Sequence, residues 1–82
     1  MSSKDFNSLT LSEKIKLLYT EGDFVTAIRY YGYKINLYLL FGYYVEVFYN
    51  HKEDRIEKAE PTNFGSKRVK FYTDQIKLPA GI

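Results

Sequence analysis

The sequence predicts an α+β fold in which an N-terminal helix, a three- to four-stranded antiparallel β-meander and a short C-terminal helix form one domain. Three patterns carry this prediction. An amphipathic segment follows a capping motif, a long run of β-branched and aromatic residues fills the middle of the chain, and apolar residues recur at helical spacing near its end. Eighty-two residues suit a single domain, in which we expect residues 1–8 and 79–82 to be flexible.

The first helix is predicted over residues 11–21. Thr10 and Glu13 have the spacing of a capping box, in which each side chain accepts a hydrogen bond from the other residue's backbone N–H. Gly22 stands where a left-handed C-terminal cap would fall. At about three turns the helix is marginal alone, so its apolar stripe must dock on the sheet. The stripe consists of Leu11, Ile15, Leu17 and Leu18.

The middle of the chain, residues 24–50, has the composition of half-buried strands. Gly32 and Gly42 interrupt it, and each supplies the positive φ that a two-residue hairpin turn needs. We therefore expect three strands, over residues 24–31, 34–40 and 43–50.

Side chains alternate across a strand, so these three strands have two distinct faces. One face is aliphatic and is expected to form the core; it includes Phe24, Ile28, Ile35, Leu37, Glu46 and Phe48. The other mixes tyrosines with small apolar and basic residues, where a one-sided sheet would be plainly polar. A three-residue loop at either turn would exchange the faces of a strand. We call the second surface the Tyr face; its interface candidates are Arg29, Tyr31, Lys34, Tyr38, Tyr43 and Tyr49.

Two further segments complete the predicted fold. Residues 55–60 read as a charged edge strand that ends at Pro61, because edge charges block unwanted strand pairing. Residues 67–76 favour a helix, with Ser66 as its N-cap. A short strand competes with that helix, since Val69 and its neighbours also alternate.

Composition excludes several classes of function. The net charge of +2 is too small to imply a polyanionic partner, and the chain has no cysteine for a disulfide or a thiolate metal site. Neither a secretory signal nor an apolar run long enough to span a membrane occurs, so we expect a cytoplasmic protein.

Candidates for catalysis or for metal and cofactor binding are few. His51 is the only histidine, and it lies in a polar loop where a solvated turn explains it better than a metal site. Glu46 projects onto the aliphatic face, so it is either a buried acid suited to proton transfer or an acid that reaches a lysine or water near the sheet end. The glycines form no phosphate-binding loop. We therefore predict a protein that is not an enzyme and binds neither metal nor cofactor.

The Tyr face is the best functional clue, and three interpretations of it remain open. The C-terminal helix covers it, or it is a protein interface, or it stacks the bases of a single-stranded nucleic acid. In the last case a basic cluster would contact phosphates; this cluster consists of Lys67, Arg68 and Lys70. Solvated surface charge is the ordinary explanation of that cluster. The sequence thus predicts an interaction domain, with self-association through the Tyr face as one form and nucleic-acid binding as the alternative.

Overall fold

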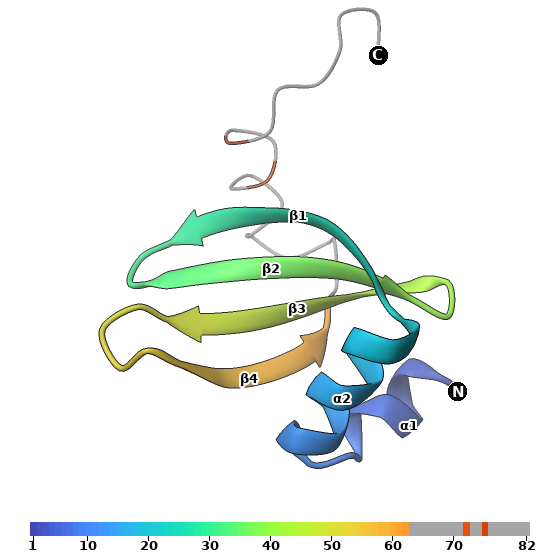
Figure 1. Cartoon of the computed structure of the whole chain (residues 1–82). Coiled ribbons are helices and arrows are strands. Elements are labelled where there is room, and N and C mark those ends of the chain that lie inside the picture. Colours follow the sequence, from blue (N-terminus) through green and yellow to red (C-terminus); the bar gives the residue numbers. More distant parts are fainter. Residues whose placement is uncertain (63–71, 73–74, 76–82) are drawn as a thin grey trace, which may run out of the picture.

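The computed structural model describes residues 1–62, 72 and 75 and has two helices followed by a four-stranded antiparallel sheet (Figure 1). The strands pair in chain order, so the predicted meander is confirmed. Each strand lies within one residue of its predicted bounds. The elements are α1 (Ser3–Asn7), α2 (Leu11–Glu21), β1 (Asp23–Tyr30), β2 (Tyr33–Leu40), β3 (Tyr43–Asn50) and β4 (Arg55–Pro61).

Helix α2 begins with the predicted capping box. The backbone N–H of Thr10 donates to Glu13 Oε1 at 2.9 Å, and that of Glu13 donates to Thr10 Oγ1 at 3.2 Å. The prediction of a left-handed cap at Gly22 is wrong, because this residue is extended, with φ −89° and ψ 156°. Glycine is favoured here by lack of room and not by its backbone conformation. A Cβ atom at this position would lie 2.7 Å from the carbonyl oxygen of Leu18.

Helix α1 is absent from the sequence prediction, which assigned residues 1–8 to a flexible end. The Ser2 side chain caps this short helix by accepting from the backbone N–H of Asp5 at 3.1 Å. Phe6 is 0% exposed, and its ring meets that of Tyr43 edge-on at 6.4 Å between centroids. A single buried aromatic side chain therefore anchors α1 on the sheet.

The two tight turns differ in which residue takes positive φ. At the β2–β3 turn Gly42 has φ 85°, as predicted, and Phe41 before it has φ 49°. At the β1–β2 turn the positive φ falls on Tyr31, at 54°, and not on Gly32 as expected. Bulky residues rarely adopt this left-handed conformation. Two aromatic residues thus occupy turn positions where asparagine or glycine is less strained.

A bulge in β1 changes the predicted faces of the sheet. Phe24 pairs with Tyr38 and Thr26 with Leu37, so Val25 is the extra residue on β1. Because one inserted residue reverses the alternation, Phe24 lies on the Tyr face. The prediction that placed Phe24 on the aliphatic face is therefore wrong. The edge-to-face packing of its ring on Tyr38, at 5.7 Å between centroids, agrees with the observed register.

Both faces of the sheet have a buried cluster. The helices cover part of the Tyr face, and Tyr72 from the C-terminal part of the chain, 7% exposed, packs on the aliphatic face. On the Tyr face the buried residues are Phe6, Leu18, Leu40, Val45, Val47 and Ala59. On the aliphatic face they are Ile28, Ile35, Leu37, Phe48 and Tyr72.

The predicted C-terminal helix over residues 67–76 lies outside the described residues, apart from Tyr72 and Gln75. The predicted flexible end at residues 79–82 lies outside them as well. The side-chain amide of Gln75 binds the edge strand β1: it accepts from the backbone N–H of Arg29 at 2.6 Å and donates to its carbonyl oxygen at 2.7 Å. This amide takes the place that a neighbouring strand's backbone would occupy.

Helices α1 and α2 lie near the end of the sheet where β2 turns into β3 (Figure 1). The opposite end has the β1–β2 and β3–β4 turns, and among the described residues no helix covers it. Neither described helix is long and apolar enough to cross a membrane.

Candidate interaction surface

The helices leave a strip of the Tyr face uncovered along β1 and β2. It consists of three successive cross-strand pairs, and we call it the open strip. Its residues are partly buried or exposed, and Phe24 is 58% exposed. The pairs are Phe24 with Tyr38, Ala27 with Asn36, and Arg29 with Lys34.

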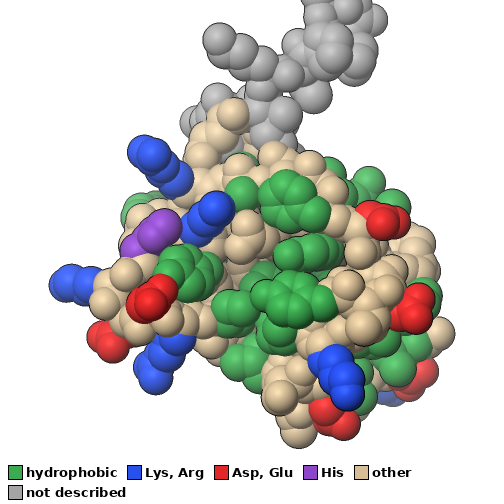
Figure 2. Space-filling model, viewed as in Figure 1, with side chains coloured by type: hydrophobic (Ala, Val, Ile, Leu, Met, Phe, Trp, Pro, Cys, Tyr) green, Lys and Arg blue, Asp and Glu red, His purple; other side chains and the backbone are tan. Residues whose placement is uncertain are grey.

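The first pair of the open strip belongs to an exposed aromatic group. Burial, and then the charge of the Tyr19 hydroxyl, raise the pKa of the Tyr38 hydroxyl. Tyr19 is 68% exposed and Val25, at the bulge, is 47% exposed. In the face of the molecule seen in Figure 2, hydrophobic side chains gather over the middle of the sheet. An apolar surface of this kind marks a site of contact with a partner more often than a solvated face.

The last pair of the open strip is basic. Arg29 and Lys34 lie directly opposite each other and are both exposed. Neither forms an ion pair with an acidic side chain in the described part of the chain. Like charges in this position repel. Beside them lies an open depression of ≈560 Å³, which is lined by Ala27, Ile28, Arg29, Tyr31, Tyr33, Lys34, His51 and Gln75.

The predicted interface residues do not all lie together. Tyr31 is 84% exposed at the β1–β2 turn, next to the basic pair. Tyr49 pairs with Lys34 across the strands and donates its hydroxyl proton to Asp54, which raises the pKa of Tyr49. Tyr43 lies under α1 instead, where burial and then the nearby Asp5 raise its pKa. Tyr43 therefore belongs to the covered part of the Tyr face.

Sequence reasoning missed two members of the surface. Phe24 was assigned to the wrong face because the bulge has no signature in the local residue pattern. Tyr19 follows Ile15 by four residues and so extends the apolar stripe of α2. That spacing predicts burial, yet Tyr19 is 68% exposed.

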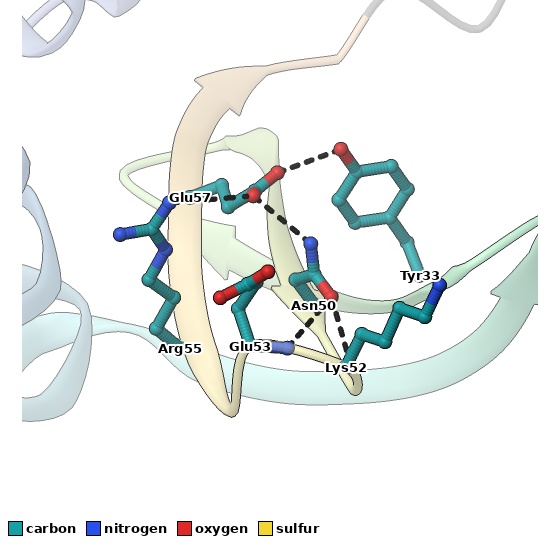
Figure 3. A network of polar contacts seen from close by, with 6 residues as sticks. All are labelled: Tyr33, Asn50, Lys52, Glu53, Arg55 and Glu57. Atoms are coloured by element: carbon teal, nitrogen blue, oxygen red, sulfur yellow. Dashed lines mark hydrogen bonds and ion pairs between the residues drawn. The ribbon is translucent and has the colours of Figure 1, made fainter.

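A polar network closes the β3–β4 turn (Figure 3). The carboxylate of Glu57 accepts from the Tyr33 hydroxyl at 2.6 Å and from Asn50 Nδ2 at 3.0 Å, and Arg55 lies 4.0 Å away. These hydrogen bonds, that from Tyr33 first, hold the pKa of Glu57 below its ordinary value. The amide oxygen of Asn50 in turn accepts the backbone N–H groups of the loop, from Lys52 at 2.9 Å and Glu53 at 3.1 Å. Glu57 is thus an ionised structural group.

Glu46 is buried on the aliphatic face, opposite Leu37, as the sequence predicts. It is 0% exposed and accepts a hydrogen bond from the Tyr72 hydroxyl at 2.9 Å. From the sequence, Glu46 is either an acid suited to proton transfer or one that reaches a lysine or water, and neither alternative includes Tyr72. Tyr72 comes from a part of the chain that local patterns do not connect to β3. This contact ties the C-terminal part of the chain to the sheet.

Among the described residues, the remaining candidates form no assembled site. His51 is exposed, and its ring meets that of Tyr49 at 5.3 Å between centroids. Within the described residues no three His, Asp or Glu side chains gather as metal ligands would. The basic cluster of Lys67, Arg68 and Lys70 lies outside the described residues. No protein-family model matches the chain, and neither a curated protein nor a solved structure shows significant similarity to it.

Proposed function

We propose that this protein is a small non-enzymatic domain that binds another protein through the open strip. The observation that carries the proposal is the exposure of apolar and aromatic side chains around the first pair of the strip: 58% for Phe24, 68% for Tyr19 and 47% for Val25. Solvated β-strands normally present polar side chains outward. A chain of this size gains little stability from exposed aromatic rings, so a partner that covers them is the simplest account.

The composition of the strip supports the same conclusion. Aromatic residues and arginine are enriched at the centres of protein interfaces, whereas lysine is typical of the rim. Phe24 and Tyr38 stand beside each other in the strip, and Arg29 lies on the same strand. The exposed Tyr31 extends the surface at the turn, where its positive φ of 54° costs about 1 kcal/mol of backbone strain.

Site-specific photo-crosslinking tests this proposal. Phe24 is replaced by the photoreactive analogue benzoylphenylalanine in the cell that makes the protein, and any adduct is identified by mass spectrometry. Phe41 is the matched control, because it is 50% exposed but lies at the β2–β3 turn, outside the strip. We expect protein adducts from position 24 and none of the same mass from position 41.

Two further results decide the outcome of that experiment. An adduct protein, once purified, must bind the unmodified chain, and Phe24→Ser must weaken this binding. Absence of adducts at position 24, or equal adducts at both positions, would show that the strip is not a protein interface.

One observation favours a second candidate, a single-stranded nucleic acid. The exposed ring of Tyr31 adjoins the basic pair of Arg29 and Lys34. In proteins that bind single-stranded nucleic acid, aromatic rings stack on the bases and basic side chains contact the phosphates. Titration with short oligonucleotides, followed by tyrosine fluorescence, tests it. Quenching that weakens with added salt would support the candidate. Unchanged fluorescence at low salt would remove it.

A further inference from the structure

The sheet has two edge strands, and the two edges differ in how they are protected. Figure 1 shows β1 at one edge and β4, with the helices beside it, at the other. An edge strand presents unpaired backbone N–H and C=O groups, which natural proteins block with charged side chains, proline, bulges or covering elements. An edge without these protections is a place where a further strand can add to the sheet.

Strand β4 has every one of these protections. It carries charged side chains and ends at Pro61, and Glu57 is the extra residue of a bulge. Lys14 Nζ on α2 donates to the carbonyl oxygen of Ala59 at 3.0 Å, and Ala59 is buried in a cluster with Phe6 of α1. The β4 edge is therefore closed to another strand.

Strand β1 is much less protected along its regular part, residues 26–30. This part contains no proline, and Arg29 is its one charged residue. The bulge at Val25 disturbs only the start of the strand. The described helices pack mainly on β4 and β2. The regular part of β1 is therefore the edge at which a strand can add.

The contact between Gln75 and Arg29 shows which backbone groups of β1 point outward. The side-chain amide of Gln75 binds both the N–H and the C=O of Arg29, at 2.6 and 2.7 Å, as the backbone of a neighbouring strand would. Outward-pointing residues alternate along an antiparallel ladder, so the N–H and C=O of Ala27 point the same way. Among the described residues, nothing outside the β1–β2 ladder bonds these groups of Ala27. Two residues of β1 thus offer four backbone hydrogen bonds.

The side chains along the same edge indicate what the added strand carries. Arg29 and Lys34 are both exposed and lie opposite each other, without an acidic partner in the described part of the chain. The residue of an added strand that pairs with Arg29 points its side chain to this same face. An acidic side chain there offsets the repulsion between the two cations, whereas a basic one adds a third. Nearer to Phe24, which is 58% exposed, an apolar side chain is favoured.

We propose that β1 binds an extended segment of another protein as a further strand, with an acidic side chain of that segment opposite Arg29. The segment bonds the backbone of Ala27 and Arg29 and displaces the amide of Gln75. This inference rests on the proposed function, because β1 forms one side of the open strip, and it adds the chemistry of the partner. In such recognition the main-chain hydrogen bonds give affinity and alternate side chains give selectivity.

Peptides displayed on phage test the proposal against the immobilised full chain. The probe is a library of random peptides about nine residues long, which is enough to span the regular part of β1. Each binder is resynthesised, and its dissociation constant is measured. We expect alternating β-forming residues with an acidic residue at one fixed position.

A charge exchange then identifies the residue that reads the peptide. Arg29→Glu should raise the dissociation constant of an acidic peptide about tenfold or more, and replacing the acid of the peptide by lysine should restore binding to this variant. Lys16→Glu, an equal charge change at an exposed position of α2, is the control and should leave binding unchanged. Thermal unfolding checks that each variant is folded, and both positions are exposed, where substitutions rarely unfold a domain.

Methylation of the peptide backbone separates strand addition from docking through side chains alone. N–H groups alternate in direction along a strand, so only every second one faces β1. We expect N-methylation to abolish binding at those alternate positions and to have little effect at the positions between them. Gln75→Ala should lower the dissociation constant about twofold or more, because the peptide no longer has to displace the amide.

The outcomes separate this inference from the proposed function. Strand addition is overturned by a library without binders, by binding that Arg29→Glu leaves unchanged, by equal sensitivity to methylation at every position, or by weaker binding to Gln75→Ala. Binders that reproduce the sequence of residues 23–30 would make a second copy of the chain the occupant and overturn it as well. If position 24 still crosslinks to another protein, the open strip remains an interface that contacts its partner through side chains. Failure of both experiments overturns both proposals.

Discussion

The hydroxyl of Tyr33 on β2 donates to the carboxylate of Glu57 on β4 at 2.6 Å, so the two side chains join strands that β3 separates. Glu57 is the extra residue of a bulge in β4, since Phe48 pairs with Lys58 and Tyr49 pairs with Ile56. The bulge and the hydrogen bond together fix the hairpin end of the sheet, next to the basic end of the open strip.

This hydrogen bond makes stability depend on pH in the acid range. It holds the pKa of Glu57 below the ordinary value of 4.5, so the folded state favours the ionised carboxylate. The resulting stability is fully present above pH 4.5 and is lost as the pH falls through the lower, folded-state pKa. We expect the urea midpoint of Tyr33→Phe to change less between pH 6 and pH 3 than that of the wild type. Equal changes in the two proteins would contradict this assignment.

The contact between Tyr72 and Glu46 predicts a loss of stability at neutral pH. Tyr72→Phe removes one hydrogen bond from a side chain that is 0% exposed, and the loss of such a bond costs about 1 kcal/mol or more of the free energy of unfolding. Urea denaturation measures this cost. Tyr19→Phe removes the same atom at a position that is 68% exposed and should change the free energy of unfolding by less than about 0.5 kcal/mol. Similar values for both variants would mean that the buried bond contributes nothing.

Loss of the capping box of α2 should lower the free energy of unfolding and also change the pKa of Glu13, which NMR can follow. Thr10→Ala should cost about 1 kcal/mol of the free energy of unfolding. The backbone N–H of Thr10, and then its side chain, hold the pKa of Glu13 below its ordinary value of 4.5. Because alanine keeps the backbone N–H, the substitution removes only the smaller contribution and should raise the pKa of Glu13 part of the way toward 4.5. Titration of the Glu13 side chain by NMR measures this shift. Ser12→Ala, which deletes an exposed hydroxyl in the first turn, is the control and should leave that pKa in place.

The unpredicted helix α1 depends on Phe6. Phe6→Ala empties a fully buried position and should cost about 3–5 kcal/mol, enough to unfold much of a domain this small. Phe24→Ala removes the same ring at an exposed position and should cost far less. Circular dichroism during thermal unfolding compares the two. A Phe6→Ala protein as stable as the wild type would show that α1 is not needed to hold the fold.

The regular parts of the fold were predictable because their signals are local. The spacing of Thr10 and Glu13 defines the start of α2, and two glycines in a run of β-formers separate β1, β2 and β3. The burial of Glu46 followed from simple alternation along β3. In each case residues that are neighbours in the chain make the interaction that decides the structure.

The candidate surface was only partly predictable, because it depends on contacts between distant segments. Arg29, Lys34 and Tyr38 lie on the same face of the sheet, as alternation along β1 and β2 indicates. Tyr43 does not, because Phe6 of an unpredicted helix covers it. Phe24 joined the surface through a bulge that shifts the register of β1 by one residue, and no pattern in β1 alone reveals it.

The sequence by itself therefore determined a helix and an antiparallel meander of three to four strands with two apolar faces. Hydrophobic periodicity and turn residues act over a few neighbouring positions, so they determine the secondary structure of each segment. Only the tertiary structure decided which part of each face is covered. That outcome depends on where α1, α2 and Tyr72 pack on the sheet. Their positions depend on side-chain packing between segments that are distant in the sequence.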